Sequence, residues 1–321
     1  MRALTVTELK GPDAVRVTEV PEPDGDGQVL IDVHAVGISF PDLLRSQGLY
    51  QERSEPPYTL GAEFAGVVAA APPAAGFKAG DRVAGLGTGA AAERLACPPE
   101  SLMALPDSLS FEQGAGLLLN YETAVVALEI RGRMRPQEAL LVHGAAGGTG
   151  TAAIQVAHAL GGTAIGVVSS EEKERVAKEA GADHVVRGDG SWKDEVLALT
   201  GGRGVDLVFD PVGGDRMLDT MRSLALGGRW LVIGFVGGAI PQVPLNRVLL
   251  RNIDVVGSYY GGYVHARPEA EAEIRLRLGG MIASGHIRPV VGSVHPLEKG
   301  GEALRDLAER RALGKVVVTV R

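Results

Sequence analysis

The sequence has a single cysteine, Cys97, and few aromatic side chains. One cysteine cannot form a disulfide within the chain, so no covalent cross-link supports the fold. Cys97 precedes two prolines and follows an apolar stretch, which is typical of a packed loop thiol and gives little support to a catalytic nucleophile. Phe, Trp and Tyr together make up 4% of the residues, so a local cluster of them stands out.

Long hydrophobic runs and an excess of basic charge are also missing. No apolar segment approaches the ~20 residues that span a bilayer, and the N-terminus MRALTVTELKGP lacks the basic-then-apolar layout of a signal peptide. The net charge is −7, the isoelectric point is near 5.6, and Lys and Arg are scattered. We therefore expect a cytoplasmic protein with no membrane or nucleic-acid partner. The 321 residues suffice for two domains with a sizeable core.

A glycine-rich turn follows an apolar segment in ALLVHGAAGGTG, residues 139–150. The pattern predicts a strand at 140–143, a turn at 144–148 and then a helix, which is the layout of a dinucleotide-binding turn. Backbone N–H groups and the helix dipole would hold a pyrophosphate there. The residues assigned to cofactor binding are Ala145, Gly147, Gly148, Thr149 and Gly150, with the alanine at the first glycine position of G-x-G-x-x-G. An ordinary strand-to-helix connection is the alternative.

Beyond the turn the sequence repeats a strand-then-helix pattern. Near-continuous apolar runs such as AIGVV, VDLVF and RWLVIG are typical of parallel strands that helices cover on both faces. Six strands are predicted, at 140–143, 163–168, 184–186, 205–209, 229–233 and 253–257. The predicted fold class is therefore α/β, in which residues 119–255 form a six-stranded doubly wound parallel sheet with its ligand at the carboxyl ends of the strands.

The flanking regions have a different pattern. Short alternating segments between Pro and Gly clusters predict antiparallel strands, at 3–8, 15–19, 28–36, 66–71 and 82–85. Toward the C-terminus we expect helices at 268–284 and 297–310 and a closing strand at 315–320 that returns to the N-terminal sheet. Residues 1–118 and 256–321 would thus form one discontinuous, mainly antiparallel β domain that faces the nucleotide domain across a cleft.

Eight motifs are spread over the whole chain. They are VGISFPDLLRSQGLY (36–50), LGAEFAGVV (60–68), GDRVAG (80–85), HGAAGGTG (143–150), KEAGADHVV (178–186), DLVFDPVGG (206–214), GRWLVIGF (228–235) and LGKVVVTV (313–320). In this order and spacing, the sequence resembles the medium-chain dehydrogenases/reductases, in particular their zinc-free quinone oxidoreductase or ζ-crystallin branch. The resemblance implies a Rossmann nucleotide domain and a GroES-like catalytic domain.

Two positions depart from the zinc-binding members of that family. By resemblance, Ser39 stands where those proteins have a cysteine, and Ala62 where they have a histidine. A catalytic zinc needs three protein ligands, and these two side chains cannot complete such a set. The histidines form no spaced ligand pair, and the four-cysteine structural lobe is missing. We predict no metal site, and without a Lewis acid the interconversion of simple alcohols and ketones is disfavoured.

The remaining chemistry is hydride delivery to an electron-poor acceptor, such as a quinone or an α,β-unsaturated carbonyl. The protein then has to hold the nicotinamide against the acceptor, exclude water and donate a hydrogen bond to the oxygen that becomes negative. The resemblance implies three catalytic candidates, Tyr50, Ser39 and Thr123. Packing in a turn is the alternative for Tyr50, and a helix-start hydroxyl is the alternative for Thr123. Asp42 and Glu63 are interpreted as structural, the first as a helix cap.

The choice of cofactor depends on the end of the second strand, where the sequence is VVSSEEKER. NAD-binding proteins carry Asp or Glu there for the ribose 2′-OH, whereas this chain has Ser169 and Ser170, with Lys173 on the first helical turn. The Lys173 ammonium could meet a 2′-phosphate, so we predict NADPH. A capping box from Ser169 to Glu172 is the competing interpretation of the serine, and such a cap does not involve the Lys173 side chain. Arg311 corresponds, by resemblance, to an arginine that reaches the adenosine phosphate.

Two further segments are predicted to line the cofactor. The loop at 234–238 follows a strand and should border the ribose and nicotinamide through Phe235 and Val236, unless its glycines only form a turn. The segment 258–263 contains three tyrosines, of which Tyr260 is assigned to the wall that contacts the cofactor or a flat acceptor. A core or subunit-interface role is the alternative. The preceding strand would be the sheet edge, and we expect a homodimer through it, as in relatives.

The sequence thus predicts an NADPH-dependent, zinc-independent reductase of quinones, by hydride or single-electron transfer. A reductase of enones or enoyl thioesters is the alternative enzyme, although a thioester carrier would need a basic entrance. For either enzyme the partner is a small-molecule acceptor, a quinone or an enone. A non-catalytic NADPH-binding structural or regulatory protein is the alternative from another class, because a fold does not determine a function.

Overall fold

The computed structural model describes residues 1–321, which form two compact units. We call Met1–Leu119 together with Pro289–Arg321 the discontinuous unit, and Asn120–Arg288 the central unit. The first boundary lies within one residue of the predicted position, whereas the second lies at 288/289 instead of 255/256. The sequence pattern had placed residues 256–288 in the discontinuous domain, whereas in the structure they belong to the central unit.

The helices of residues 256–288 belong to the central unit because buried polar contacts hold them there. Glu122 is bonded both by Tyr260 and by Arg275, from two successive helices. Gln155 donates to the carbonyl oxygen of Arg288 at 2.9 Å and accepts from its backbone N–H at 2.9 Å. Such contacts between residues more than a hundred positions apart are invisible to a reading of local periodicity.

The central unit is built on a six-stranded sheet whose order is β11-β10-β9-β12-β13-β14. Its strands are β9 (Ala139–His143), β10 (Thr163–Val168), β11 (His184–Arg187), β12 (Val205–Asp210), β13 (Leu224–Val232) and β14 (Asp254–Gly257). All neighbouring pairs are parallel. This confirms the predicted doubly wound sheet, and the chain order reverses between β9 and β12, where such sheets bind ligands.

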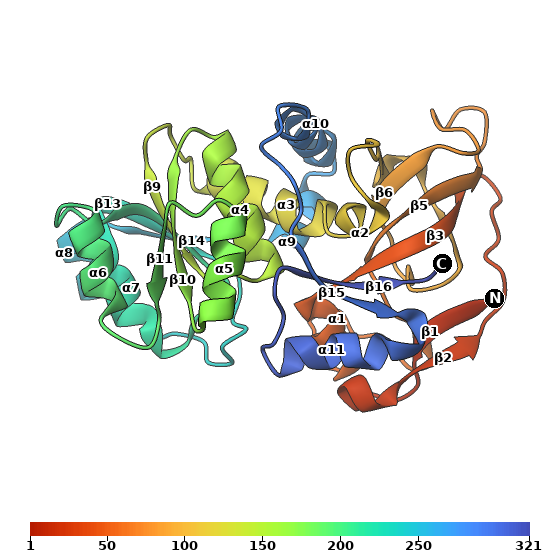
Figure 1. The fold of residues 1–321 in the computed structure, drawn as a ribbon, viewed down its shortest axis with the longest axis horizontal. Helices are drawn as coiled ribbons and strands as arrows, with labels where there is room; N and C mark the ends of the chain where they lie inside the picture. Colours follow the sequence, from red (N-terminus) through yellow and green to blue (C-terminus); the bar gives the residue numbers. More distant parts are fainter. The chain divides into compact units, whose positions relative to one another are not determined.

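Helices cover both faces of this sheet. Figure 1 shows α4 and α5 on one face and α6 and α7 on the other. The helical segments are α3 (Leu118–Val125), the π-helix η3 (Val126–Arg131), α4 (Gly148–Ala159), α5 (Glu171–Glu179), α6 (Trp192–Leu199), η4 (Gly214–Arg216), α7 (Met217–Ser223), α8 (Leu245–Arg251), α9 (Tyr260–Ala266) and α10 (Glu269–Ala283). Between helices and sheet lies a core of fully buried side chains that includes Leu141, Val208 and Trp230. Burial on both faces explains the near-continuous apolar strands.

The discontinuous unit contains two sheets, ordered β2-β1-β4 and β15-β16-β3-β5-β6-β8, with β7 also paired to β3. The strands are β1 (Arg2–Val6), β2 (Val15–Glu19), β3 (Val29–Ile38), β4 (Tyr58–Thr59), β5 (Glu63–Ala70), β6 (Arg82–Leu86), β7 (Arg94–Cys97), β8 (Leu102–Ala104), β15 (Val291–Pro296) and β16 (Lys315–Thr319). β16 pairs antiparallel with β3, so the closing strand returns to the N-terminal sheet as predicted. β15 and β16 form the parallel exception.

Short helices complete this unit. They are η1 (Gly11–Ala14), α1 (Phe40–Ser46), η2 (Pro99–Ser101), α2 (Phe111–Gly114), η5 (Leu297–Lys299) and α11 (Gly300–Ala308). α1 begins after Ser39, whose backbone N–H donates to Asp42 Oδ2 at 2.8 Å. This contact confirms Asp42 as a helix cap. Cys97 lies on β7 and not in a loop, and burial raises the pKa of its thiol, as suits a packed side chain.

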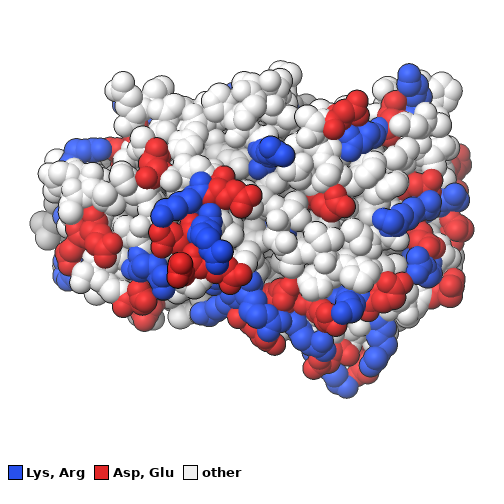
Figure 2. Space-filling view, viewed as in Figure 1, with Lys and Arg blue, Asp and Glu red and all other residues white.

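Charged side chains of both signs are interspersed on the surface. On the face drawn in Figure 2, Lys and Arg alternate with Asp and Glu instead of gathering in one basic patch. Many of them are paired, as in the contact between Lys178 Nζ and Glu174 Oε1 at 2.6 Å. None of the helices combines the length and the hydrophobicity that a bilayer-spanning segment requires.

Candidate nucleotide-binding and acceptor sites

The turn between β9 and α4 has room for its unusual alanine. Ala145 stands at the first glycine position and is fully buried, and its backbone N–H donates to Val167 on β10 at 3.3 Å. Gly166 makes the space for the methyl group, because a Cβ built there would lie 2.9 Å from the Ala145 Cβ. Ala145 therefore shapes the turn, and neither its side chain nor its N–H is directed to a ligand.

Gly150 allows α4 to pack closely against the turn. A Cβ at this position would lie 2.2 Å from the carbonyl oxygen of Gly144, a distance that real Cβ atoms do not reach. Gly144 itself has a φ of +62°, in the left-handed region that favours glycine. Gly147 is the N-cap of α4, with no side chain to cap the helix. The start of α4 therefore has no side chain that caps its first backbone N–H groups.

The first N–H groups of α4 form an anion site. Thr151 is the first residue of the helix whose N–H bonds within the turn, to Gly147 O at 2.9 Å. The N–H groups of Gly148, Thr149 and Gly150 have no acceptor in the protein. Three open donors at the positive end of a helix suit a pyrophosphate, so the residues present fit a dinucleotide.

Ser169, Ser170 and Lys173 lie together at the end of β10. Ser170 is the N-cap of α5, and its hydroxyl accepts from the Lys173 backbone N–H at 3.2 Å. The predicted capping box from Ser169 to Glu172 is therefore wrong, because Ser170 is the cap and the third helical residue is Lys173. Ser169 is instead the acceptor of the Lys173 side chain, with Nζ 3.2 Å from Oγ.

Arg187 joins this cluster from the neighbouring strand, and sequence reasoning missed it. Arg187 pairs in register with Val168 at the carboxyl ends of β11 and β10. Its Nη2 donates to the carbonyl oxygen of Ser169 at 3.3 Å, and its Nε is buried without a partner. Asp189 is 3.9 Å away, at the limit of an ion pair. Arg187 directly follows the motif KEAGADHVV, so it stands at the end of the predicted strand. Aligning that strand in register with the preceding one could have placed Arg187 beside Ser169.

The loops after β12 and β13 are fixed by Asp210. This buried carboxylate accepts from the N–H groups of Val212 and Gly213 at 2.9 Å through Oδ1, and from Trp230 Nε1 at 3.0 Å through Oδ2. The predicted loop residues follow at the same edge. Val236 donates its N–H to Pro211 O at 3.0 Å, and the Phe235 ring lies against Gly213, where a Cβ would meet it at 2.9 Å. Phe235 and Val236 thus lie at the carboxyl ends of the strands, as expected.

Tyr260 lies in the core of the central unit. Its hydroxyl donates to Glu122 Oε2, and Arg275 Nε donates to Glu122 Oε1 at 2.9 Å. Glu122 is fully buried, and burial raises the pKa of its carboxyl to about 7. An engaged hydroxyl and a buried ring favour the alternative interpretation of Tyr260, a core role. Thr123, next to Glu122, lies within α3 and not at its start.

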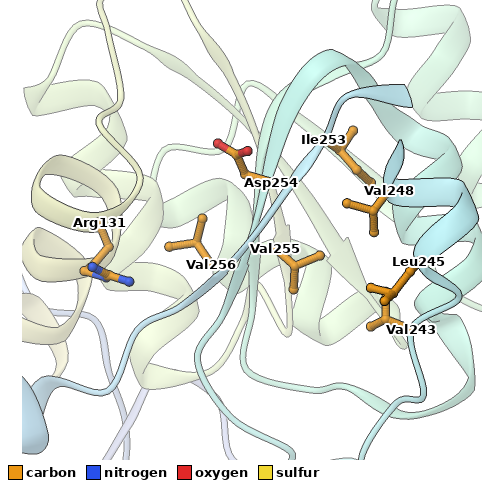
Figure 3. A pocket seen from close by; sticks show the side chains of 8 residues that line it. All are labelled: Arg131, Val243, Leu245, Val248, Ile253, Asp254, Val255 and Val256. Carbon is orange, nitrogen blue, oxygen red and sulfur yellow. The ribbon is translucent and has the colours of Figure 1, made fainter. Parts of the chain in front are cut away.

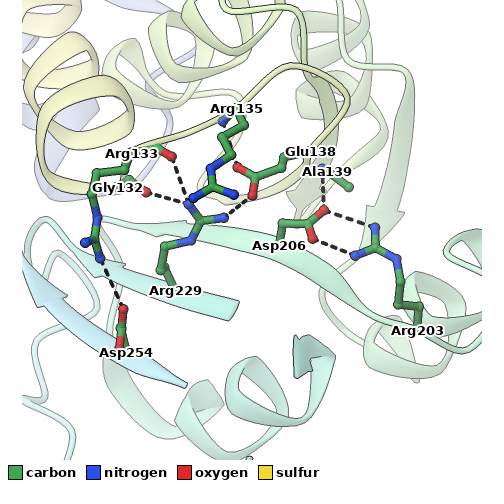
Figure 4. A network of polar contacts seen from close by, with 9 residues as sticks. All are labelled: Gly132, Arg133, Arg135, Glu138, Ala139, Arg203, Asp206, Arg229 and Asp254. Carbon is green, nitrogen blue, oxygen red and sulfur yellow. Dashed lines mark hydrogen bonds and ion pairs between the residues drawn. The ribbon is translucent and has the colours of Figure 1, made fainter. Parts of the chain in front are cut away.

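A second polar network at the amino ends of the strands is structural. Figure 4 shows Arg229 reaching the carbonyl oxygens of Gly132 and Arg133, at 2.7 and 3.0 Å, and the carboxylate of Glu138 at 2.5 Å. Asp206 accepts from the Ala139 N–H at 2.9 Å. The guanidinium of Arg229 is thus shared among protein oxygens at the edge opposite the turn.

Ser39 belongs to a buried cluster in the discontinuous unit. Its Oγ accepts from Lys315 Nζ at 2.8 Å, and the same ammonium lies 2.5 Å from Glu63 Oε2. Glu63 Oε1 accepts from the Leu119 N–H at 2.9 Å. Burial raises the pKa of the Glu63 carboxyl, against the lowering effect of Lys315. The interpretation of Glu63 as structural did not foresee Lys315, which is visible as the one charged residue of the motif LGKVVVTV.

The other predicted residues of the discontinuous unit have charged partners of their own. The Arg45 guanidinium lies over the Tyr50 ring, 5.0 Å from its centre. Arg311 is exposed and ion-paired with Asp306, at 3.1 Å, and with Glu309. Ser39, Tyr50 and Arg311 therefore belong to the discontinuous unit, whereas Thr123 and the residues of the turn belong to the central unit.

The donor set around Ser39 does not fit a zinc ion. An ammonium already occupies one side of its hydroxyl, and like charge opposes a cation there. No three His, Cys, Asp or Glu side chains are grouped so that they could hold a metal. The residues around Ser39 therefore do not make a zinc site.

The parallel sheet, the bare helix start and the second, mainly antiparallel unit define a two-domain dinucleotide-binding protein. Residues 25–107 match the family model of the alcohol dehydrogenase GroES-like domain, and residues 148–276 match that of the zinc-binding dehydrogenases. The quinone oxidoreductase-like protein 2 of Rattus norvegicus is 39% identical over 325 residues, which cover 100% of this chain and 92% of that protein. The chain belongs to the medium-chain dehydrogenase/reductase family, in its zinc-free quinone oxidoreductase branch.

Two further relatives are similar over nearly their whole length. The quinone oxidoreductase of Rattus norvegicus is 32% identical over 326 residues, with 99% of this chain and 97% of that protein covered. The solved structure of the quinone oxidoreductase from Thermus thermophilus, also determined as its complex with NADPH, is 34% identical. It superposes with a TM-score of 0.86 and covers 100% of both chains. The chain is thus a member of a family of oxidoreductases.

Proposed function

We propose that this protein is an NADPH-dependent, zinc-independent reductase of quinones. The observation that carries the cofactor choice is the meeting of Lys173 and Arg187 at Ser169, where NAD-binding relatives would carry an acidic residue. Two cations and two hydroxyl groups suit the dianionic 2′-phosphate that distinguishes NADPH from NADH. The similarity to the Thermus thermophilus enzyme supports both the cofactor and the acceptor.

The bound dinucleotide supplies the hydride, and the central unit holds it. The N–H groups of Gly148, Thr149 and Gly150 bind the pyrophosphate, because they are the open donors of the turn. The loop that carries Phe235 and Val236 borders the nicotinamide half at the carboxyl ends of the strands. Thr123 is assigned to the same half.

The acceptor is an electron-poor small molecule whose oxygen becomes negative during reduction. Ser39 and Tyr50 are the hydrogen-bond donors that we assign to it. Arg311 is assigned to the adenosine phosphate, and this requires its guanidinium to exchange at least one of its carboxylate partners, Asp306 or Glu309.

We also propose a homodimer formed through β14. This strand lies at the edge of the sheet and pairs only with β13. Next to it is a pocket of ≈ 460 Å³, and Figure 3 shows that it is lined by Val243, Leu245, Val248, Val255 and neighbouring side chains. The α8 residues Leu245, Leu249 and Leu250 are 76%, 74% and 76% exposed. An unpaired edge beside exposed leucines suits a second copy of the same strand, which would pair with it and cover the leucines.

The test of the function is a turnover assay with a metal chelator present. NADPH oxidation is followed with a benzoquinone or naphthoquinone, and separately with an alkenone or crotonyl-CoA. Turnover with the quinones supports the proposal, whereas turnover with the conjugated carbonyls alone makes the protein an enone or enoyl reductase. Tight NADPH binding without turnover of either acceptor contradicts the enzymatic role and favours a structural or regulatory protein.

A further inference from the structure

We propose that Lys315 is a positioning residue that makes Ser39 a dedicated hydrogen-bond donor to the acceptor oxygen. This inference rests on the proposed function, since it concerns how the same acceptor is stabilised. It depends on three features of the discontinuous unit: the direction of the hydrogen bond between Lys315 and Ser39, the burial of the Lys315–Glu63 pair, and the space in which the lysine side chain runs.

The hydrogen bond between Lys315 and Ser39 has only one possible direction. An ammonium has three donors and no acceptor, so Ser39 Oγ must accept the 2.8 Å contact from Lys315 Nζ. The Ser39 O–H is not used in this contact, and the protein offers it no other acceptor. Ser39 is half-buried, in contrast to the fully buried Lys315 and Glu63. The Ser39 O–H can therefore donate a hydrogen bond to a ligand.

The charge behind Ser39 is buried and oriented. The Lys315 side chain is 3% exposed and that of Glu63 is 0% exposed. The Glu63 carboxylate is also fixed on its other side, because Oε1 accepts from the Leu119 N–H at 2.9 Å. The ammonium is the member of the ion pair that contacts Ser39. In a low-dielectric interior such a charge polarises the hydroxyl and strengthens the bond that its O–H donates.

The fold keeps a narrow path free for the lysine. A Cβ at Gly37 on β3 would lie 1.9 Å from the carbonyl oxygen of Ala115 and 2.4 Å from Lys315 Cε, and a Cβ at Gly116 would lie 3.0 Å from Lys315 Cγ. The lysine stem therefore passes between two residues without side chains. Buried ion pairs cost desolvation energy and are often no more stabilising than apolar residues of the same size. A role in stability alone does not explain a lysine at the start of the apolar strand β16, whereas a role toward Ser39 does.

The chemistry of the step is balanced without a proton from this cluster. A hydride, two electrons and a proton, moves from the reduced nicotinamide to the acceptor, and the acceptor oxygen carries the negative charge until it takes a proton from water. Ser39 donates a hydrogen bond to that oxygen and keeps its own proton. No proton moves to or from Lys315 in this step. The Ser39 hydrogen bond stabilises the transition state, in which the negative charge develops on the acceptor oxygen. Its effect therefore appears in kcat and not in nucleotide binding.

The experiment compares Ser39→Ala, the paired variant Lys315→Met/Glu63→Gln, and all three substitutions together. The paired variant removes the ammonium without leaving a buried carboxylate unpaired, and its glutamine can still accept from Leu119. Each is purified with its thermal unfolding recorded, and kcat and KM are measured for a quinone and for NADPH. The matched control is Lys178→Met/Glu174→Gln, which removes an exposed Lys–Glu pair with a 2.6 Å contact on α5.

We expect the Ser39→Ala variant and the paired variant each to lose about 100-fold in kcat, as for the loss of one donor to a developing oxyanion, with unchanged KM for NADPH. The triple variant should lose no more than either, because both act through one hydrogen bond. Ser39→Thr, which keeps the hydroxyl, should retain most of kcat, and the control should match the wild type.

Two results would overturn the inference. One is a folded paired variant with wild-type kcat, and the other is a triple variant whose losses multiply, which would show that the ion pair acts independently of Ser39. A wild-type protein that reduces neither quinone nor conjugated carbonyl overturns the proposed function together with this inference. Active wild-type protein with unaffected variants overturns the inference alone.

Discussion

Arg187 Nη2 donates to the carbonyl oxygen of Ser169 at 3.3 Å, across the carboxyl ends of two neighbouring parallel strands. Lys173 reaches the hydroxyl of the same serine from the first turn of α5. Residues from three consecutive elements therefore surround one point at the end of β10. A phosphate at that point would meet both cations.

The first prediction concerns the preference for NADPH. Lys173→Ala and Arg187→Ala should each weaken NADPH binding by roughly 1–3 kcal/mol, because each removes a charge-assisted contact to the 2′-phosphate. NADH binding should change much less. Dissociation constants of both nucleotides, measured by titration calorimetry, check this. Lys178→Ala, on the same helix, is the control, and equal weakening of NADPH and NADH would refute the assignment.

The second prediction concerns the turn. Gly150→Ala places a Cβ 2.2 Å from Gly144 O, so α4 must shift and its open N–H groups lose their alignment. We expect loss of nucleotide binding and a stability lower by about 1–3 kcal/mol. The control is Gly280→Ala in α10, where nothing lies within 4 Å, and which should raise stability by about 0.5–1 kcal/mol. Unchanged nucleotide affinity in Gly150→Ala would contradict the anion site.

The third prediction concerns acid stability. Burial lowers the pKa of His143 from 6.5 to about 4, so the folded state keeps this imidazole neutral. The unfolded chain takes up the proton first as the pH falls. The contribution of neutral His143 to the free energy of unfolding should therefore be fully present above pH 6.5. As the pH falls toward 4, the free energy of unfolding should decline by up to about 3 kcal/mol.

Denaturant titrations at neutral and acid pH test this contribution of His143. His143→Gln should flatten the decline, since glutamine can still bond Thr220, the partner that lies 2.9 Å from the imidazole Nε2. His265→Gln, at an exposed histidine, serves as the control. If both variants show the wild-type dependence on pH, His143 is not the residue responsible.

The fourth prediction concerns the subunit contact. Leu249→Glu and Val255→Glu each place a charge beside the unpaired edge of β14, so they should convert a dimer into monomers. Light scattering after gel filtration gives the mass. Leu276→Glu, which replaces a leucine that is 79% exposed on α10, should leave the dimer intact. A monomeric wild-type protein would contradict the proposed dimer directly.

Local patterns in the sequence predicted the strands of the fold, although not the unit to which residues 256–288 belong. The period of the apolar residues predicted all six parallel strands, and the Gly-rich turn lies between β9 and α4 as expected. The cap at Asp42 was also predictable, because a capping box extends over only four residues. These features depend on neighbours in the chain, which is the information that a periodicity contains.

Contacts between distant segments could not be predicted in the same way. Arg187 reaches Ser169 through strand register, and Lys315 reaches Ser39 through the pairing of β16 with β3. The cluster of three tyrosines suggested a cofactor or acceptor wall for Tyr260, because nothing local reveals Glu122 as its partner. The roles of the site residues, the dimer and the cytoplasmic location stay predictions.

The position of β16 also bears on how the chain is made. This strand, the last in the sequence, lies between β3 and β15 in the sheet of the discontinuous unit, and Lys315 at its start is the counter-ion of Glu63. Residues 1–119 are synthesised before residues 289–321, so we expect their sheet to stay open, and Glu63 to lack this counter-ion, until β16 has left the ribosome. The central unit, whose sheet needs no residue from either end, can close earlier. We therefore expect the discontinuous unit to close after the central unit.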